Sequence, residues 1–290
     1  MRFSGSYVAL VTPFHADGSV NFEKLRELVE WHVRQGTDGI VALGTTGESS
    51  TMSHEEDDAV ARAVIETVNG RIPVICGAGS NSTQTQLEKS RRYHDMGADG
   101  LLLITPYYNK ANDEGMYRHF AVVADAVDTP IILYNVPGRT GCSISPACCA
   151  RLAAHPNIAG IKEASGSIGY TAQIAKLVND DFCMFSGNDD MIVPIMSLGG
   201  CGVISVWANI CPKEVHALTS AFASGDIAKA REIQLKYLEL IGALFCEVNP
   251  IPVKEAMNQM GMEVGGYRLP LCEISPEGRE RVRRALEVLR

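Results

Sequence analysis

The stretch IILYNVPGRTGCSISPACCARLAAHPNIAGIK, residues 131–162, decides the fold. Its ends are the short runs Ile131–Tyr134 and Ala159–Ile161, and both faces of each run are apolar, as expected for strands buried in a parallel sheet. Between them Ser145 comes directly before Pro146, which is typical of a helix N-cap followed by proline at the first helical position. The stretch therefore predicts a strand–helix–strand unit of a parallel α/β fold.

The same alternation continues on both sides of this stretch. Six more β-rich apolar runs occur: Tyr7–Val11, Gly39–Leu43, Ile72–Cys76, Leu101–Ile104, Phe182–Phe185 and Val203–Val206. Among the helical segments between them, one begins with Ser53 and Glu56 in the spacing of a capping box. Another begins with Thr83 and Gln86 in the same spacing. About eight repeats over ~250 residues favour a closed (β/α)₈ TIM barrel over an open doubly wound sheet.

The chain changes character after Gly225. Three helical segments follow with no strand pattern between them: Asp226–Cys246, Pro252–Met260 and Pro276–Leu289. In the last segment apolar residues recur with helical spacing, and Ser275 is its expected N-cap. We therefore expect a barrel over residues 1–224 and an appended C-terminal helical region over residues 225–290.

Composition excludes several classes of protein. The 290 residues are enough for one large core, and a content of 46% hydrophobic and 21% charged residues is ordinary for a globular protein. A net charge of −8 argues against binding to nucleic acid or to an anionic membrane. The amino terminus lacks the apolar segment of a signal peptide, and no apolar run approaches the ~18 residues of a membrane span. We expect a cytoplasmic protein.

Cysteines and histidines give no support for a disulfide framework or a metal. The nine cysteines include no Cys-x-x-Cys pair, so we expect reduced core residues in a reducing compartment. The seven histidines are scattered, without the spacing of a zinc site. The stretch Asn188–Asp190 could suggest a metal, but a helix N-cap is the favoured interpretation. The loop Gly77–Ser82 lacks the last glycine of a dinucleotide loop and follows the third strand, so NAD is not expected.

Lys162 directly follows the apolar run Ile158–Ile161. An amine placed there would be partly desolvated, which lowers its pKa, and a neutral amine can attack a ketone and form a Schiff base. The alternative is an ordinary lysine just past a strand with its head in water, and spacing alone favours it. In a barrel of this kind, however, the carboxyl ends of the strands converge on the active site. Lys162, Tyr134 and Thr45 would therefore meet at one mouth.

Other strand ends carry further candidate groups. The turn Gly44–Glu48, of sequence Gly-Thr-Thr-Gly-Glu, offers amides and hydroxyls that could bind a carboxylate, or it is simply a turn. Tyr134 could pass protons, or it is a buried barrel-lining tyrosine. Arg139 offers a guanidinium suited to a carboxylate, or it forms a surface salt bridge. Lys254, in a helical segment, is predicted to be a surface lysine with its head in water.

Together these stretches resemble the dihydrodipicolinate synthase family. The resemblance rests on six motifs that occur in order over nearly the whole chain: Gly44–Ser49, Pro106–Asn109, Tyr134–Gly141, Gly160–Gly166, Gly202–Val206 and Asn249–Lys254. It implies that Lys162 forms an imine with pyruvate and that the derived enamine attacks L-aspartate 4-semialdehyde. The product would be 4-hydroxy-tetrahydrodipicolinate, a precursor of diaminopimelate and lysine. No cofactor and no metal would be needed.

The resemblance also implies a role for each matching residue. Tyr134, Thr45 and Tyr108 would form a proton relay, with Tyr108 reaching into a neighbouring subunit of a homotetramer that is a dimer of dimers. Thr45 and Thr46 would hold the carboxylate of pyruvate. Arg139 would hold the carboxylate of the aldehyde substrate. The pocket would be shaped by two further residues, Gly187 and Ile204.

Feedback by lysine is a separate expectation from the resemblance. Inhibited members bind lysine in a cleft at the dimer interface, and four residues match positions around it: Ser49, His54, Asn81 and Tyr107. Thr85 stands where inhibited members have a glutamate that would pair with the ammonium group of the inhibitor. Asp57 stands where some members have a histidine. We therefore expect weak or absent inhibition by lysine.

Alternative functions remain open at this point. The nearest is another Schiff-base pyruvate aldolase, such as N-acetylneuraminate lyase or a keto-sugar-acid aldolase, but the Thr45-Thr46 pair and Arg139 favour the synthase. A non-catalytic barrel that binds a keto acid is disfavoured because Lys162 and the relay residues are all present. A nicotinamide oxidoreductase is disfavoured by the glycine loop described above. Trp207, just past the eighth strand, has no explanation from the sequence.

Overall fold

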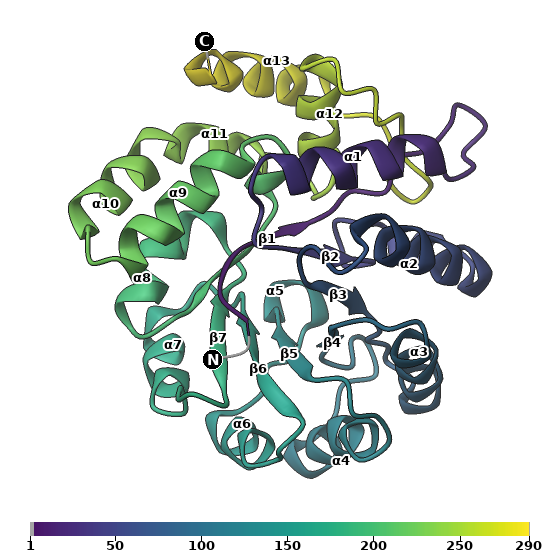
Figure 1. The fold of residues 1–290 in the computed structure, drawn as a ribbon, viewed down its shortest axis with the longest axis vertical. Helices are drawn as coiled ribbons and strands as arrows, with labels where there is room; N and C mark the ends of the chain where they lie inside the picture. The colour runs from purple at the N-terminus through teal and green to yellow at the C-terminus, as the bar shows by residue number, and fades with distance from the viewer. Residues whose placement is uncertain (1–2, 290) are drawn as a thin grey trace. The chain divides into compact units, whose positions relative to one another are not determined.

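The computed structural model describes residues 3–289, in which eight strands follow one another in a closed parallel barrel (Figure 1). Their bounds are β1 Gly5–Ala9, β2 Gly39–Ala42, β3 Val74–Gly77, β4 Gly100–Ile104, β5 Ile131–Asn135, β6 Ile158–Glu163, β7 Cys183–Ser186 and β8 Gly202–Ser205. Each predicted apolar run coincides with one of these strands to within two residues at either end. The predicted (β/α)₈ barrel is confirmed.

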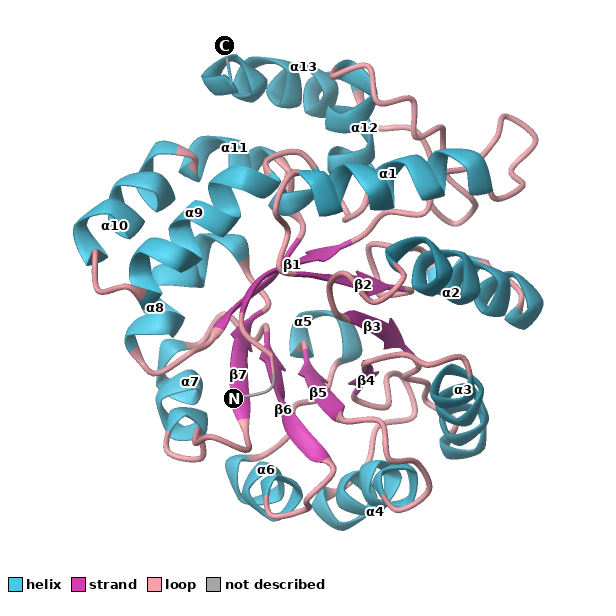
Figure 2. Ribbon diagram, viewed as in Figure 1, coloured by secondary structure: helices cyan, strands magenta, loops and turns pink. Residues whose placement is uncertain are grey.

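Helices separate the strands and continue after the last one (Figure 2). The α-helices are α1 Phe22–Arg34, α2 His54–Val68, α3 Thr83–Asp95, α4 Asp113–Ala124, α5 Pro137–Thr140, α6 Pro146–Ala153, α7 Ile168–Ala175, α8 Ile192–Ser197, α9 Pro212–Ala223, α10 Ile227–Lys236, α11 Leu238–Ala243, α12 Ile251–Gln259 and α13 Pro276–Ala285. The 3₁₀ turns are η1 Ser49–Thr51, η2 Asp189–Met191, η3 Trp207–Asn209 and η4 Leu286–Leu289. In the described residues after β8 every regular element is helical, as expected for the C-terminal region.

The chain forms two compact units. The first takes in the chain up to Gly5 together with Pro73–Ile204, and the second takes in Ser6–Ile72 and the chain from Ser205 onward. Strands β3 to β7 and β8 up to Ile204 therefore belong to the first unit, whereas β2 and the C-terminal helices belong to the second. Within the second unit α9 packs beside α10. The boundary between a barrel and a helical region at residue 225 stays a prediction.

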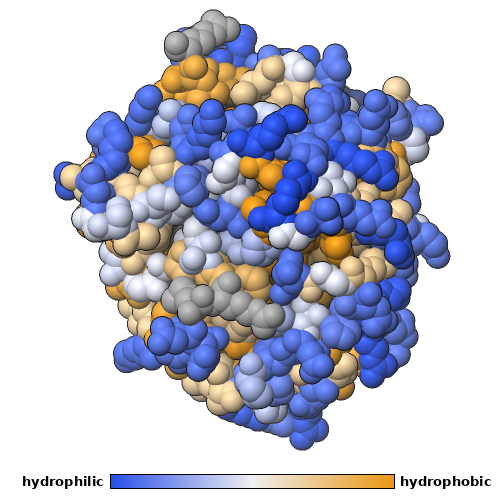
Figure 3. All heavy atoms as spheres, viewed as in Figure 1, coloured by the Kyte–Doolittle hydropathy of each residue, from blue (hydrophilic) through white to orange (hydrophobic). Residues whose placement is uncertain are grey.

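The strands are buried on both faces. In β5, Ile131, Ile132 and Leu133 are consecutive residues with no exposed surface, and Ile161 of β6 is equally buried. Hydrophilic residues predominate on the face drawn in Figure 3, where hydrophobic atoms lie in small patches. Continuous burial explains why an apolar run, and not an apolar–polar alternation, marks each strand in the sequence.

Three of the predicted helix starts are confirmed. The Ser53 hydroxyl accepts from the Glu56 backbone N–H at 3.2 Å, and the Glu56 carboxylate accepts from the Ser53 N–H at 3.0 Å, which completes a capping box. Ser145 and Ser275 each cap a helix that has proline at its first position. These caps satisfy backbone donors that the first helical turn leaves unpaired.

The predicted capping box at Thr83 is wrong by one residue. The N-cap of α3 is Ser82, whose hydroxyl accepts from the backbone N–H of Thr85 at 3.4 Å. Thr83 is already helical, and its hydroxyl instead pairs with Nδ1 of His119 at 2.8 Å. A tertiary hydrogen bond therefore takes the side chain that the local pattern assigned to capping.

The predicted helix Asp226–Cys246 is two helices that meet at Tyr237. The ring of Tyr237 packs at a tilt against the ring of Trp207, with 5.1 Å between their centres. Trp207 is completely buried in η3. The large ring of Trp207 therefore fills the core beneath the break between α10 and α11, which supplies the explanation that the sequence lacked.

Two other expectations from the sequence concern membrane-spanning helices and the state of the cysteines. Within residues 3–289, no helix is both long and apolar enough to cross a membrane. The nine cysteines are free, and six of them are buried, which confirms the core interpretation for most of them. It is wrong for Cys272, which is exposed because it lies in the irregular segment between α12 and α13.

Candidate active site

Lys162 lies inside β6, one residue before its end, and its side chain is only 6% exposed. The alternative of a lysine with its head in water is therefore wrong. Burial lowers the pKa of the amine to about 8, although the Asp189 carboxylate opposes this and Arg139 adds to it. Because desolvation disfavours the ammonium form, a substantial fraction of Lys162 is a neutral nucleophile near this pH.

Tyr134 is the register partner of Lys162 on the neighbouring strand β5. The Nζ of Lys162 lies 4.5 Å from the centre of the Tyr134 ring, and the tyrosine is 7% exposed. The structure thus brings these two predicted site residues together. The ring keeps water from one side of the amine, and the phenol belongs to the same end of the sheet.

Close approach of backbone shapes the space around Lys162. A Cβ on Gly187 would lie 3.1 Å from Cε of Lys162 and 2.6 Å from Cβ of Ala164, so only glycine fits there without a shift. The N–H of Gly187 donates to the carbonyl of Glu163 at 2.7 Å. Ile204 is fully buried in β8 of the same unit. These positions agree with the expected pocket-shaping roles, which stay predictions.

Arg139 projects from the short helix α5 and is exposed. The turn that carries it is closed by Asn135, whose side-chain oxygen accepts from the Ser143 hydroxyl at 3.0 Å and from the Ile144 N–H at 3.1 Å. The Asn135 amide nitrogen donates to the Glu163 carboxylate at 2.9 Å. One side chain therefore ties both ends of the Arg139 turn to β6, the strand that bears Lys162.

Glu163 is a residue that sequence reasoning missed. Its carboxylate also accepts from the backbone N–H of Ser165 at 2.8 Å and from the hydroxyl of Ser165, and it is 1% exposed. Burial raises the pKa of this carboxyl, although its hydrogen bonds act in the opposite direction. The available signal was its position directly after Lys162. Neighbouring residues of a strand point to opposite faces, so a strand that is buried on both faces buries Glu163 as well as Lys162.

Tyr108 lies in the loop after β4 and is 91% exposed. Its φ of 69° is in the left-handed region, which is uncommon for an aromatic residue. The side chain of the neighbouring Tyr107 is also exposed. That Tyr108 serves a neighbouring subunit stays a prediction.

Thr45 and Thr46 belong to the second unit, in the turn between β2 and η1. The turn is closed by the Gly47 N–H, which donates to the Gly44 carbonyl at 3.0 Å. The Thr12 hydroxyl donates to the Gly47 carbonyl at 2.6 Å. Thr46 is buried. Their participation with Lys162 in one site stays a prediction.

Lys254 is not a surface lysine, so that prediction is wrong. Its side chain is fully buried, and its ammonium group lies 2.8 Å from the Glu48 carboxylate. It also donates to the carbonyls of Thr12 at 3.1 Å and Gly266 at 2.5 Å, and it lies 4.4 Å from the centre of the Phe14 ring. The helical pattern could not reveal this, because the carboxylate partner is 206 residues away in the chain.

The residues expected around a lysine cleft lie in both units. In the second unit, the Ser49 hydroxyl donates to the buried Asp57 carboxylate at 3.1 Å, and His54 is exposed at the start of α2. In the first unit, the Asn81 carbonyl accepts from the side chain of Asn109 at 2.9 Å. A cleft that combines them stays a prediction.

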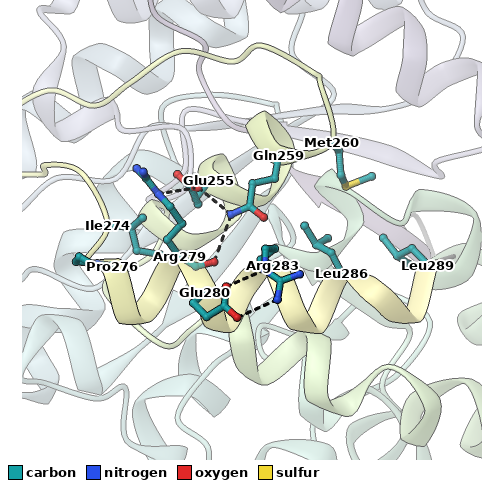
Figure 4. Close-up of a pocket in the computed structure, with 10 residues that line it drawn as sticks. All are labelled: Glu255, Gln259, Met260, Ile274, Pro276, Arg279, Glu280, Arg283, Leu286 and Leu289. Atoms are coloured by element: carbon teal, nitrogen blue, oxygen red, sulfur yellow. Dashed lines mark hydrogen bonds and ion pairs between the residues drawn. The ribbon is translucent and has the colours of Figure 1, made fainter.

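Three other features can be checked in residues 3–289: a possible metal site, the expected cap at Asn188 and a further cavity. Among residues 3–289, no group of three His, Cys, Asp or Glu side chains is placed to hold a metal ion. Asn188 takes the N-cap position of η2, but its side chain does not cap it. A cavity of about 760 Å³ lies between α12 and α13, outside the predicted site. Its charged groups pair with one another, as Glu280 does with Arg283 (Figure 4).

A closed (β/α)₈ barrel with a desolvated lysine at the carboxyl end of a strand is the arrangement that a Schiff-base-forming enzyme needs. The chain belongs to the dihydrodipicolinate synthetase family, whose family model matches residues 2–289. The family assignment made from the sequence is thus confirmed.

Similar proteins support the same assignment. The chain is 53% identical over 285 residues to a 4-hydroxy-tetrahydrodipicolinate synthase of Thermoanaerobacter pseudethanolicus, covering 98% of this chain and 96% of the relative. It is 52% identical over 272 residues to the enzyme of that name from Clostridium perfringens, covering 94% and 93%. The structure matches that of a chloride-inhibited dihydrodipicolinate synthase from Acinetobacter baumannii complexed with pyruvate. The TM-score is 0.96, with 46% identity and 98% of each chain covered.

Proposed function

We propose that the protein condenses pyruvate with L-aspartate 4-semialdehyde to 4-hydroxy-tetrahydrodipicolinate through an imine on Lys162. The observation that carries the proposal is the buried Lys162 amine, with its pKa lowered to about 8 and Tyr134 beside it. Membership in the dihydrodipicolinate synthetase family and the names of the relatives support the choice of substrates.

The chemistry needs no cofactor, because lysine supplies the electron sink. The neutral amine attacks C2 of pyruvate, a C–N double bond forms, and the ketone oxygen leaves as water. The protonated imine accepts the electrons of a methyl C–H bond as its proton departs, which gives an enamine. The enamine carbon attacks the aldehyde carbon, whose oxygen takes a proton. The amine of the second substrate then attacks the imine carbon, closes the ring and releases Lys162.

We assign roles to the remaining residues on the family resemblance. Tyr134, Thr45 and Tyr108 relay protons, and Thr46 holds the carboxylate of pyruvate with Thr45. The exposed guanidinium of Arg139 suits the carboxylate of the second substrate. The high exposure of Tyr108 supports its insertion into a neighbouring subunit of a homotetramer. The cytoplasmic location and the weak response to lysine also stay predictions.

The test is borohydride trapping followed by a coupled assay. Full-length protein treated with pyruvate and borohydride should gain one reduced pyruvate adduct on Lys162. Lys162→Ala should gain none, and Lys176→Ala, which removes an exposed lysine of the same unit, should behave as the parent does. With both substrates and dihydrodipicolinate reductase, the parent should consume NADPH. No adduct would overturn the imine, and an adduct without NADPH consumption would overturn the second substrate and point to sugar-acid aldehydes.

A further inference from the structure

The turn Gly44–Glu48 is held by side chains from the C-terminal part of the second unit. The amide nitrogen of Asn249 donates to the hydroxyl oxygen of Thr46 at 2.9 Å. Five residues further along, Lys254 forms the buried ion pair with Glu48. Thr46 is 3% exposed and Asn249 is 5% exposed, so both hydrogen-bonding groups lie out of bulk water. No role for Asn249 was expected from the sequence.

The contact from Asn249 determines what the Thr46 hydroxyl can do. A threonine hydroxyl has one proton to donate and lone pairs that accept. An amide nitrogen only donates, so the Thr46 oxygen is the acceptor in this hydrogen bond. The hydroxyl proton of Thr46 must therefore point away from Asn249, toward a different acceptor. A carboxylate is an acceptor-only group and would receive it.

We propose that Asn249 is a positioning residue that holds the Thr46 hydroxyl as a hydrogen-bond donor toward the carboxylate of a 2-oxo acid. The inference rests on the proposed function, which brings the carboxylate of pyruvate to this turn. Asn249 itself touches no reacting atom and acts only through Thr46.

The neighbouring ion pair supports the same use of the turn. Glu48 is two residues from Thr46, and an uncompensated carboxylate there would repel a bound carboxylate. The ammonium group of Lys254, 2.8 Å from Glu48, cancels that charge. The turn therefore presents a donor without a nearby net negative charge. An acid in place of Asn249 would undo both features, since it would accept from Thr46 and add a charge.

The first test measures pyruvate binding in Asn249→Asp. Aspartate has nearly the same shape as asparagine but only accepts, so the Thr46 proton should turn toward it. We expect the pyruvate concentration that gives half-maximal borohydride trapping to rise at least about tenfold, with a smaller change in the limiting rate. Asn69→Asp, which adds a carboxylate at the exposed end of α2, should leave the half-maximal concentration unchanged. An unchanged value in Asn249→Asp would overturn the proposal.

A double-mutant cycle separates positioning from a merely structural role. Asn249→Ala should raise the half-maximal pyruvate concentration in the parent and in Thr46→Ser, which keeps the hydroxyl. It should have no further effect in Thr46→Val, where there is no hydroxyl to orient. An equal effect in all three backgrounds would overturn the proposal. Absence of any trapped imine in the parent would instead overturn the proposed function.

Discussion

The Nζ of Lys162 lies 4.5 Å from the centre of the Tyr134 ring, and the two residues are register partners on adjacent strands. The ring contributes to the burial that lowers the pKa of the amine, whereas the phenolic hydroxyl is a separate group that can carry a proton. The two contributions of one side chain can therefore be removed one at a time.

In Tyr134→Phe the ring stays and the hydroxyl is lost. Below pH 8 the Lys162 amine is mostly protonated and cannot attack, so the rate of imine trapping should rise with pH through about 8 and then level off. We expect this profile to survive in Tyr134→Phe, because the burial is unchanged. Turnover in the coupled assay should fall by roughly 10²-fold or more. A midpoint moved toward the usual lysine pKa, or full turnover, would contradict this division.

Gly187→Ala should block the space that Lys162 occupies. The added Cβ would meet Ala164 at 2.6 Å and Cε of Lys162 at 3.1 Å, so the lysine side chain must move. A displacement of about 1 Å at a reacting group costs on the order of 10²-fold in rate. The Cβ added by Gly169→Ala, in α7 of the same unit, would lie 3.9 Å from Oγ of Ser167, which is ordinary contact, so this variant should keep normal trapping. Equal trapping rates in both variants would show that Lys162 does not need the Gly187 space.

The sequence predicted the strands well because each is an uninterrupted apolar run. It also predicted that Lys162 and Tyr134 lie close together, because both end such runs, and their catalytic roles stay predictions. It failed where a partner is distant in the chain. Lys254 has the local pattern of an exposed helical lysine. Only the pairing with Glu48, which is 206 residues away in the chain, offsets the cost of burying its charge. Asn249 was missed for the same reason, since its contact with Thr46 spans 203 residues. Periodicity reports which face of an element is buried, and it carries no information on which polar groups meet there.

The ion pair between Arg268 and Glu56 should account for part of the loss of stability of the fold in acid. The two nitrogens of the guanidinium lie 2.8 and 2.6 Å from the two carboxylate oxygens, and this bond lowers the pKa of Glu56 to about 2. A depressed carboxyl pKa stabilises the fold above the unfolded value of about 4.5, and the stabilisation is lost as pH falls from there toward 2.

In Arg268→Leu we therefore expect the free energy of unfolding, measured in urea, to fall less steeply with acid between pH 4.5 and 2 than in the parent. Arg26→Leu is the control, because the Arg26 guanidinium bonds to the backbone carbonyl of Phe22. Its acid dependence should follow that of the parent. Parallel curves for Arg268→Leu and the parent would mean that the Glu56 pKa is not lowered by this contact.

The buried pair of Lys254 and Glu48 should be costly to break and much less costly to replace. Removing one partner leaves an uncompensated charge in the core, so Lys254→Met should lower the free energy of unfolding by about 3–5 kcal/mol. Glu48→Gln should also destabilise, because it leaves the ammonium group facing only carbonyl oxygens. The double variant Lys254→Met with Glu48→Gln carries neither charge and should be clearly more stable than the sum of the two losses predicts. Urea unfolding of the four proteins at one pH gives the coupling. Simple additivity would mean that the two charges do not stabilise each other, and that the carbonyls of Thr12 and Gly266 alone hold Lys254.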